Sequence, residues 1–201
     1  VISDRLKLDL AYIIAFQFLR GKYTLEAAYR IAPRIACEMI SQVRAISRYK
    51  NFGFYQNLYE MVTEKTFIKN TIWKQMFIQE RMDYYAAVFY NKYWAFYVFD
   101  EDVLLTCDSP VIVKDCKTKE TKPFHVGLIQ KNTVICFAIS PRLLVVLYSE
   151  KSYLSEIDCK IYGVDDKALV DEYNRANVDQ CNSQVYSKSE ELLKNVVKNR
   201  I

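Results

Sequence analysis

Glycine and proline are both scarce in this sequence, with four of each among 201 residues. So few glycines leave no Gly-rich loop to cradle a phosphate, and neither a Walker motif nor a dinucleotide-binding fingerprint occurs. The G-x-S-x-G and H-E-x-x-H motifs of hydrolases and zinc proteases are absent as well. The sequence therefore carries no signature of these nucleotide-binding, hydrolase and zinc-protease classes. With so few glycines and prolines, we also expect no long flexible linker.

Metal-binding and nucleophilic residues are also few. His125 is the only histidine and none of the six cysteines forms a C-x-x-C pair, so we expect no metal and no cofactor. Cys116 is the cysteine nearest to His125, but nothing else supports a Cys-His nucleophile, and we expect a loop histidine. Cys136 lies in the apolar segment TVICFAI, as small buried thiols do in a reducing cytosol, so the expected location is cytoplasmic.

Net charge and hydropathy further limit the class of protein to which the chain can belong. The net charge of +4 is too small to indicate nucleic-acid binding by itself. The apolar run AYIIAFQFL is too short to cross a bilayer and no signal peptide occurs, so we expect no membrane association. Apolar residues make up 51% of the chain, which predicts a packed core. Because the sequence opens in mid-pattern at Val1, we expect a fragment of a longer protein.

The hydrophobic periodicity predicts one α+β domain over residues 1–201. Helices are expected over residues 1–91, strands of a central antiparallel sheet over 92–162, and C-terminal helices over 166–200. Several of the strand-like runs are apolar at consecutive positions, which predicts a sheet covered on both faces. The helices before and after the strands are the expected cover.

Local signals place the helix ends. Ser3 is the expected N-cap of a helix over residues 4–20, and Thr24 that of the next helix. Pro33 is expected to break or kink this second helix, because proline lacks the N–H that a helix interior needs. The apolar pattern then continues through Ile35, Met39, Val43 and Ile46. Later in the chain, Asp165 is a candidate N-cap, and the run from Ser187 to Glu190 fits a capping box.

The strand region opens with YWAFYVF and DVLLTC, which Asp100 and Glu101 separate. This spacing predicts a β-hairpin, with the acidic turn exposed to solvent. The segments PVIV, TVICFAI, LLVVLYS and DCKIYGV continue the series of predicted strands.

A polar corner interrupts the strands at Asp108, Ser109 and Pro110, inside the stretch VLLTCDSPVIV. Aspartate side chains bond backbone amides two residues on, and proline fixes its own φ and keeps the preceding residue extended. We therefore favour a structural bend. The alternative is a catalytic carboxylate at a strand end.

Two further patterns concern nucleic acids. Asp108, Glu120 and Lys122 share the skeleton of a metal-dependent nuclease site, but KDCKTKETKPFH reads more simply as a solvated loop. Arg30 and Arg34, with Arg44 and Arg48, fall near one helix face and form a basic ridge that can meet phosphates. A solvated face with nearby glutamates is the preferred interpretation of this ridge.

Ser140, Pro141 and Arg142 lie between two predicted strands and indicate a turn. If this turn is adjacent to the polar corner, Arg142 faces Asp108 and forms an ion pair or a polar binding site with it. The sequence alone leaves both possibilities open.

Four segments together resemble the DUF4238 family, in the order in which that family has them. These are AYIIAFQFLRG, LLTCDSPVIV, ICFAISPRLLVVLYSE and VDEYNRANVDQCNSQVYS, and they cover the chain from Ala11 to Ser187. The resemblance implies an intracellular bacterial protein without an assigned reaction. It also implies six candidate site positions, namely Arg20, Asp108, Pro110, Ser140, Pro141 and Asn174.

The chain departs from the family pattern at two places. Cys107 and Ser109 stand where the family has Ser and Asn on either side of Asp108. The family's His-x-x-Pro segment has no counterpart here, and His125 does not match it. If that histidine is functional in the family, its activity is absent from this chain.

Two functions remain open. The first is a binding or regulatory module with a macromolecular partner, either a protein or a nucleic acid. The alternative is a metal-dependent, nuclease-like enzyme of the defence or toxin kind. Convergence of Arg20, Asp108, Arg142 and Asn174 on one concave surface would indicate a site, with Arg30, Arg34 and Ser140 as further binding candidates.

Overall fold

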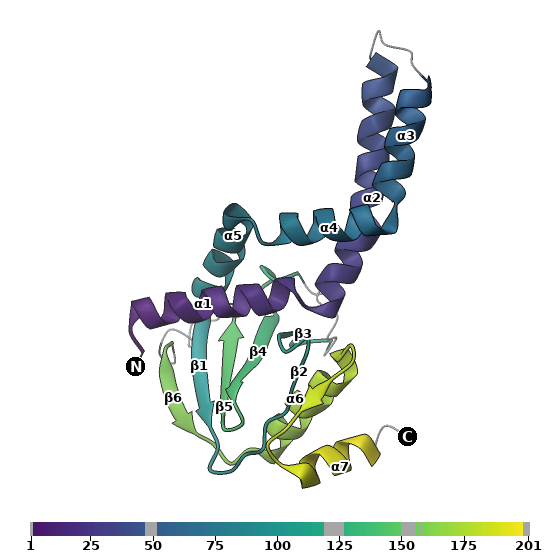
Figure 1. Cartoon of the computed structure of the whole chain (residues 1–201). Helices are drawn as coiled ribbons and strands as arrows, with labels where there is room; N and C mark the ends of the chain where they lie inside the picture. The colour runs from purple at the N-terminus through teal and green to yellow at the C-terminus, as the bar shows by residue number, and fades with distance from the viewer. Residues whose placement is uncertain (1, 47–51, 119–126, 150–155, 157, 199–201) are drawn as a thin grey trace.

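The structure is a computed structural model, which describes residues 2–46, 52–118, 127–149, 156 and 158–198 (Figure 1). The helices are α1 (Asp4–Leu19), α2 (Lys22–Ile46), α3 (Phe52–Thr63), α4 (Lys65–Met76), α5 (Gln79–Tyr90), α6 (Lys167–Gln180) and α7 (Glu190–Lys198). The strands are β1 (Tyr93–Val98), β2 (Thr106–Cys107), β3 (Ile112–Asp115), β4 (Thr133–Ser140), β5 (Leu143–Tyr148), β6 (Lys160–Gly163) and β7 (Val185–Tyr186). The predicted α+β class is confirmed.

The central sheet has five strands in the order β3-β4-β5-β1-β6. The pairs β3/β4, β4/β5 and β5/β1 are antiparallel, as predicted. Strand β6 instead runs parallel to β1, so the sheet is mixed rather than wholly antiparallel. Alternation of side chains along a strand says which face is buried but carries no information on the direction of the neighbouring strand.

Both faces of the sheet are covered, as expected. One face, with Trp94 of β1 and Leu147 of β5, packs against α1 and α5. The opposite face, with Leu144 and Val146 of β5, packs against Tyr173 and other residues of α6. Adjacent residues of β5 thus point to opposite faces and each meets a helical layer, which explains the continuous apolar run LLVVLY.

The predicted hairpin between residues 93 and 107 is wrong. Strand β1 pairs with β5 and β6, whereas the short β2 pairs with β7 in a separate two-stranded sheet. Between them residues 102–105 belong to no strand, although Leu104 N bonds Pro141 O, and Leu104 and Leu105 are buried. An apolar run predicts burial, and here burial is achieved by packing rather than by pairing with the preceding strand.

Three helix starts differ from the predictions, while Ser3 caps α1 as expected, accepting a bond from Leu6 N. Helix α2 already begins at Lys22, so Thr24 lies in its first turn, and the helix continues through Pro33 without interruption. Asp166, rather than Asp165, caps α6. At α7 the cap is Ser189 rather than Ser187, where the predicted capping box begins. The Oγ of Ser189 accepts a hydrogen bond from the N–H of Leu192.

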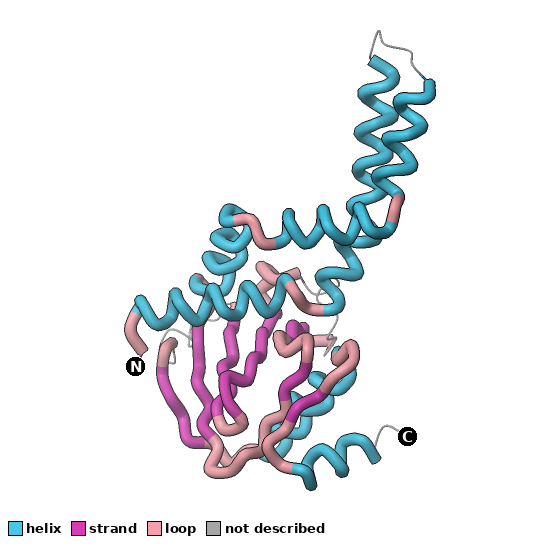
Figure 2. Tube along the Cα trace, in the orientation of Figure 1, coloured by secondary structure: helices cyan, strands magenta, loops and turns pink. Residues whose placement is uncertain are grey.

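A helical hairpin projects from the globular part of the molecule. Helices α2 and α3 run side by side in opposite directions, and α4 leads back to α5 above the sheet (Figures 1 and 2). We call the projecting part, residues 31–46 of α2 together with α3, the arm. The Ser41 hydroxyl of α2 contacts the Tyr59 hydroxyl of α3 at 2.6 Å, which defines the side of α2 that faces α3.

Candidate functional site

Asp108 holds the turn that follows α6. Its carboxylate accepts hydrogen bonds from Asn182 N at 2.9 Å and from both the N–H and the hydroxyl of Ser183 at 2.8 Å. Burial alone raises the pKa of this carboxyl, but the bonds from the 182–184 turn outweigh it and bring the pKa below 3.8. Asp108 is therefore ionised at neutral pH and engaged by donors. Its catalytic role stays a prediction.

Ser109 joins three segments at the same corner. Its hydroxyl accepts from the N–H of Lys22 at 2.9 Å, which satisfies one of the unpaired donors at the start of α2. Its carbonyl accepts from the side-chain amide of buried Gln180, at the end of α6. The corner thus connects the first turn of α2, the segment that leads to β3, and helix α6.

Asn174 lies on the inner face of α6 and is 4% exposed. Its Oδ1 accepts from Leu105 N and its Nδ2 donates to Val103 O, both at 2.8 Å. One side chain therefore supplies the donor and acceptor that a neighbouring strand would otherwise provide to the segment before β2.

The remaining candidates lie elsewhere. Arg20 is the half-exposed C-cap residue of α1. Ser140 ends β4 and Arg142 lies in the turn that follows, where Arg142 Nε lies 2.8 Å from Asp102 Oδ1. Lys188 Nζ lies 3.1 Å from the other oxygen of Asp102, and bonds from both cations lower the pKa of this carboxyl. Arg142 thus pairs with Asp102 rather than with Asp108.

Arg30 and Arg34 lie on the exposed side of α2, outside the corner and the turn. The hydrogen bonds and ion pairs of Asp108, Arg142 and Asn174 do not join these residues to one another. Asp108 binds the turn after α6, whereas Arg142 and Asn174 bind different residues of the segment 102–105. Glu120, Lys122 and His125 lie outside the described residues. Within the described residues, no group of three or more His, Cys, Asp or Glu side chains could hold a metal ion.

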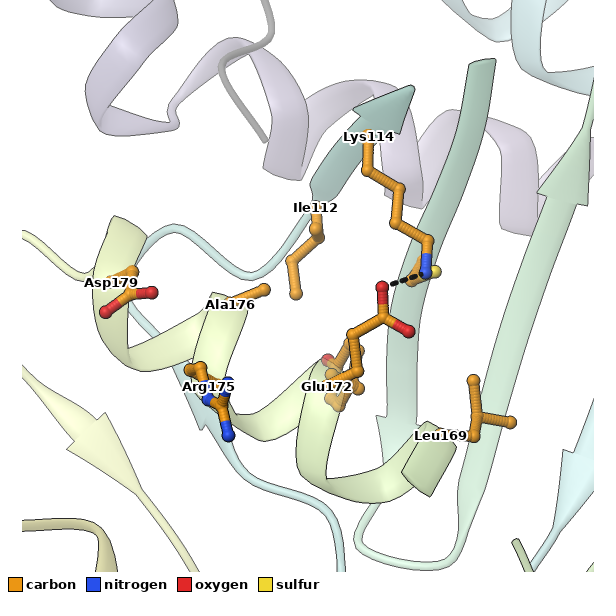
Figure 3. Close-up of a pocket in the computed structure, with 9 residues that line it drawn as sticks. Ile112, Lys114, Leu169, Glu172, Arg175, Ala176 and Asp179 are labelled. Atoms are coloured by element: carbon orange, nitrogen blue, oxygen red, sulfur yellow. Dashed lines mark hydrogen bonds and ion pairs between the residues drawn. The ribbon is translucent and has the colours of Figure 1, made fainter. Parts of the chain in front are cut away.

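A cavity of about 320 Å³ lies between β3 and α6 (Figure 3). Lys114 of β3 reaches across it to Glu172 of α6, with Nζ and Oε1 2.9 Å apart. Burial lowers the pKa of Lys114, but the Cys136 sulfur, in its ionised form, and the Glu172 carboxylate outweigh this, so its pKa is raised. Lys114 therefore stays charged and paired.

Two further groups of this cavity, those of Cys136 and Tyr173, are poorly suited to catalysis. Burial raises the pKa of the Cys136 thiol to about 11, so the sulfur stays protonated at neutral pH and is a weak nucleophile. The Tyr173 hydroxyl oxygen accepts a hydrogen bond from the N–H of Ala138 at 3.0 Å. The cavity can hold a small ligand, but none of these groups is placed as a nucleophile beside a base.

The family model for DUF4238, described as a protein of unknown function, matches residues 2–191. The chain belongs to the DUF4238 family. No curated protein and no solved structure matches it. Membership of the DUF4238 family therefore shows what this chain is related to but assigns it no reaction. In addition, none of the described helices is long and apolar enough to span a membrane.

The arm of this DUF4238 chain exposes an apolar stripe on α2. The stripe consists of four residues spaced four apart, whose exposed fractions are 45% for Ile31, 55% for Ile35, 60% for Met39 and 53% for Val43. At about 100° per residue, Ser41 lies on the opposite side of the helix from Met39 and Val43. Because Ser41 contacts α3, the stripe faces away from α3 and into solvent.

Sequence reasoning found the helical spacing of this stripe but did not predict its exposure. It missed Lys114 and Glu172 altogether, because they are 58 residues apart and neither carries a local motif. The only sequence signal for this pair was the lysine that ends the apolar run PVIV.

A buried lysine in the same chain gives a pH-dependent prediction. Lys92 is 5% exposed and its Nζ donates to Leu128 O at 2.7 Å and to the Ser149 hydroxyl at 2.6 Å. Burial lowers its pKa from 10.5 to about 8. Between these values the unfolded chain binds more protons than the folded one, so stability rises with pH. We expect this contribution to be about 1–2 kcal/mol after allowance for solvent screening.

The measurement is urea unfolding of the wild type and Lys92→Met from pH 7 to pH 10.5. Buried groups with raised pKa values, such as Cys136 and Tyr173, oppose the trend in both proteins, so only the difference between them is informative. We expect the wild type to gain stability relative to the variant as the pH rises. A difference that does not change with pH would contradict the prediction.

Proposed function

We propose that this DUF4238 chain is a binding module that docks a protein partner on its arm. The carrying observation is the exposed apolar stripe of α2, which faces away from α3. The helical hairpin that carries it projects from the rest of the molecule (Figure 1). Contiguous exposed apolar surface bordered by polar residues is typical of protein interaction sites.

The character of the stripe favours a protein over a nucleic acid. Its centre is aliphatic, and its border carries charges of both signs, Arg30 and Arg34 followed by Glu38. A surface for phosphates needs uniformly basic side chains, because neutralised phosphates supply most of the affinity.

The contacts of the catalytic candidates support binding over catalysis. The oxygens of Asp108 accept three bonds from the turn after α6, and the amide of Asn174 is used by residues 103 and 105. Both contacts serve the fold of the chain. The metal-dependent nuclease stays an alternative prediction, and two of its three residues lie outside the described part of the structure.

A reducing compartment fits the cysteines, since all six are free thiols. We infer a cytoplasmic setting from this, because disulfides are rare there. A bacterial source rests on the family resemblance alone.

A capture experiment tests the proposal. Tagged full-length chain is incubated with a lysate to which untagged chain has been added, and the retained proteins are quantified for wild type and the variant I35E/M39E. We expect the variant to retain the partner at least about tenfold less, since apolar residues at the centre of an interface carry most of the affinity.

The matched control is Ile161→Glu, which removes an isoleucine of similar exposure, 56%, from the edge strand β6. This variant should retain the partner like the wild type. Equal retention by I35E/M39E and wild type, or no protein retained by either, would rule out the arm as a docking surface. Far-UV circular dichroism confirms that all three proteins remain folded.

A further inference from the structure

We propose that the partner docked on the arm is a second copy of this chain, with the two α2 stripes packed against each other in antiparallel orientation. This inference rests on the proposed function of the arm and specifies its occupant.

The spacing of the stripe fits packing between identical helices. Ile31, Ile35, Met39 and Val43 form one row at four-residue intervals, which extends over about 18 Å of the helix. Rows of this kind are inclined to the helix axis, and two of them lie alongside each other when the helices cross at about −50°, a common packing geometry. In antiparallel orientation Ile35 of one copy then lies beside Met39 of the other, and Ile31 beside Val43.

The charges bordering the stripe select the antiparallel orientation. The row directly beside it is Arg30, Arg34, Glu38 and Gln42. A twofold axis between antiparallel helices brings the same border of both copies together, so Arg34 of each copy faces Glu38 of the other. Arg30 correspondingly faces Gln42. The apolar contacts between the two stripes and the contacts between their borders thus require registers that differ by no more than two residues.

A parallel arrangement lacks this complementarity. It would bring the border row of one copy against the opposite border of the other, which consists of Ala32, Ala36, Ile40 and Arg44. Arg34 would then face small apolar side chains instead of a carboxylate. Among the described residues, neither Arg30 nor Arg34 has a carboxylate partner within its own chain, so both guanidinium groups are available to a second copy.

Within the described residues of the arm, α3 does not cover the stripe. Helix α3 lies on the opposite side of α2, as the Ser41–Tyr59 contact shows, so the two copies would form the layers α3, α2, α2 and α3. Four aliphatic side chains per copy make a small interface, and we expect a reversible dimer with a dissociation constant of about 1–100 µM.

Sedimentation velocity of the full chain between about 1 and about 200 µM tests the inference. The wild type should shift from monomer to dimer over this range, and I35E/M39E should remain monomeric. The Ile161→Glu control should dimerise like the wild type. A wild type that remains monomeric, or an I35E/M39E variant that dimerises equally well, overturns the proposal.

A charge exchange tests the orientation. R34E and E38R each place like charges at both symmetric contacts and should each weaken the dimer about tenfold, more at low salt. The double variant R34E/E38R restores opposite charges and should recover wild-type association. Failure of the double variant to recover overturns the antiparallel register.

The two proposals fail differently. A monomeric chain that still captures another protein through Ile35 and Met39 overturns self-docking and leaves the arm as a binding surface. A monomeric chain that shifts an RNA or DNA probe through Arg30 and Arg34 also overturns it. Dimerisation abolished by I35E/M39E supports both proposals together.

Discussion

Replacing Asn174 by leucine is expected to lower the free energy of unfolding by about 3 kcal/mol. The Asn174 amide is the partner of Leu105 N and Val103 O, and Leu105 is fully buried. Without it both backbone groups are left without a partner in an apolar environment, where a buried donor or acceptor is costly.

Urea unfolding of Asn174→Leu beside Arg175→Ala measures this effect. Arg175 is the next residue of α6 and lies on its exposed side, so its truncation should change stability by less than about 0.5 kcal/mol. Asn174→Asp keeps the acceptor for Leu105 N but places a carboxylate oxygen against Val103 O in a buried site, so we expect a loss at least as large. A loss below about 1 kcal/mol for Asn174→Leu would show that the amide is not needed to hold the segment.

Replacing Asp108 by alanine is expected to cost about 2 kcal/mol at neutral pH, because the turn after α6 loses an ionised acceptor of three hydrogen bonds. The pKa of this carboxyl is lowered in the folded state from 3.8, so its contribution is present above pH 3.8 and is lost as the pH falls through the folded pKa. The difference between wild type and variant should therefore disappear in acid.

Thermal unfolding of both proteins between about pH 2.5 and pH 7 checks the sign and the window. Asp108→Asn keeps an acceptor without the charge, and it should lie between wild type and alanine at neutral pH. A stability difference that persists unchanged at the acid end would mean that ionisation of Asp108 does not hold the turn.

The fold could be predicted from sequence to the extent that it depends on local patterns. Ser3 capped α1 as expected, and the apolar runs around Val113, Ile135 and Val145 all formed strands. What failed was the choice of neighbours. β1 pairs with β5 instead of the chain that follows it, and β6 runs parallel to β1. Pairing depends on contacts between distant segments, which local periodicity does not encode.

The candidate functional residues show the same division between local sequence signals and contacts that form only in the folded chain. Asp108 was recognisable because its carboxylate precedes a proline between two apolar runs, a local signal. The Lys114–Glu172 pair was not, since its members approach only after β3 and α6 have packed. The stripe through Ile35 and Met39 has the same spacing whether its own chain or another molecule covers it, so exposure had to be read from the structure.

The proline within α2 has a mechanical consequence. The first turn of that helix is fastened to Ser109, while most of the stripe lies beyond Pro33. Proline leaves the carbonyl four residues earlier, that of Tyr29, without its usual donor, so bending costs least at this level. We therefore expect a load applied near Met39 to bend α2 around Pro33 before it reaches the corner beside the sheet.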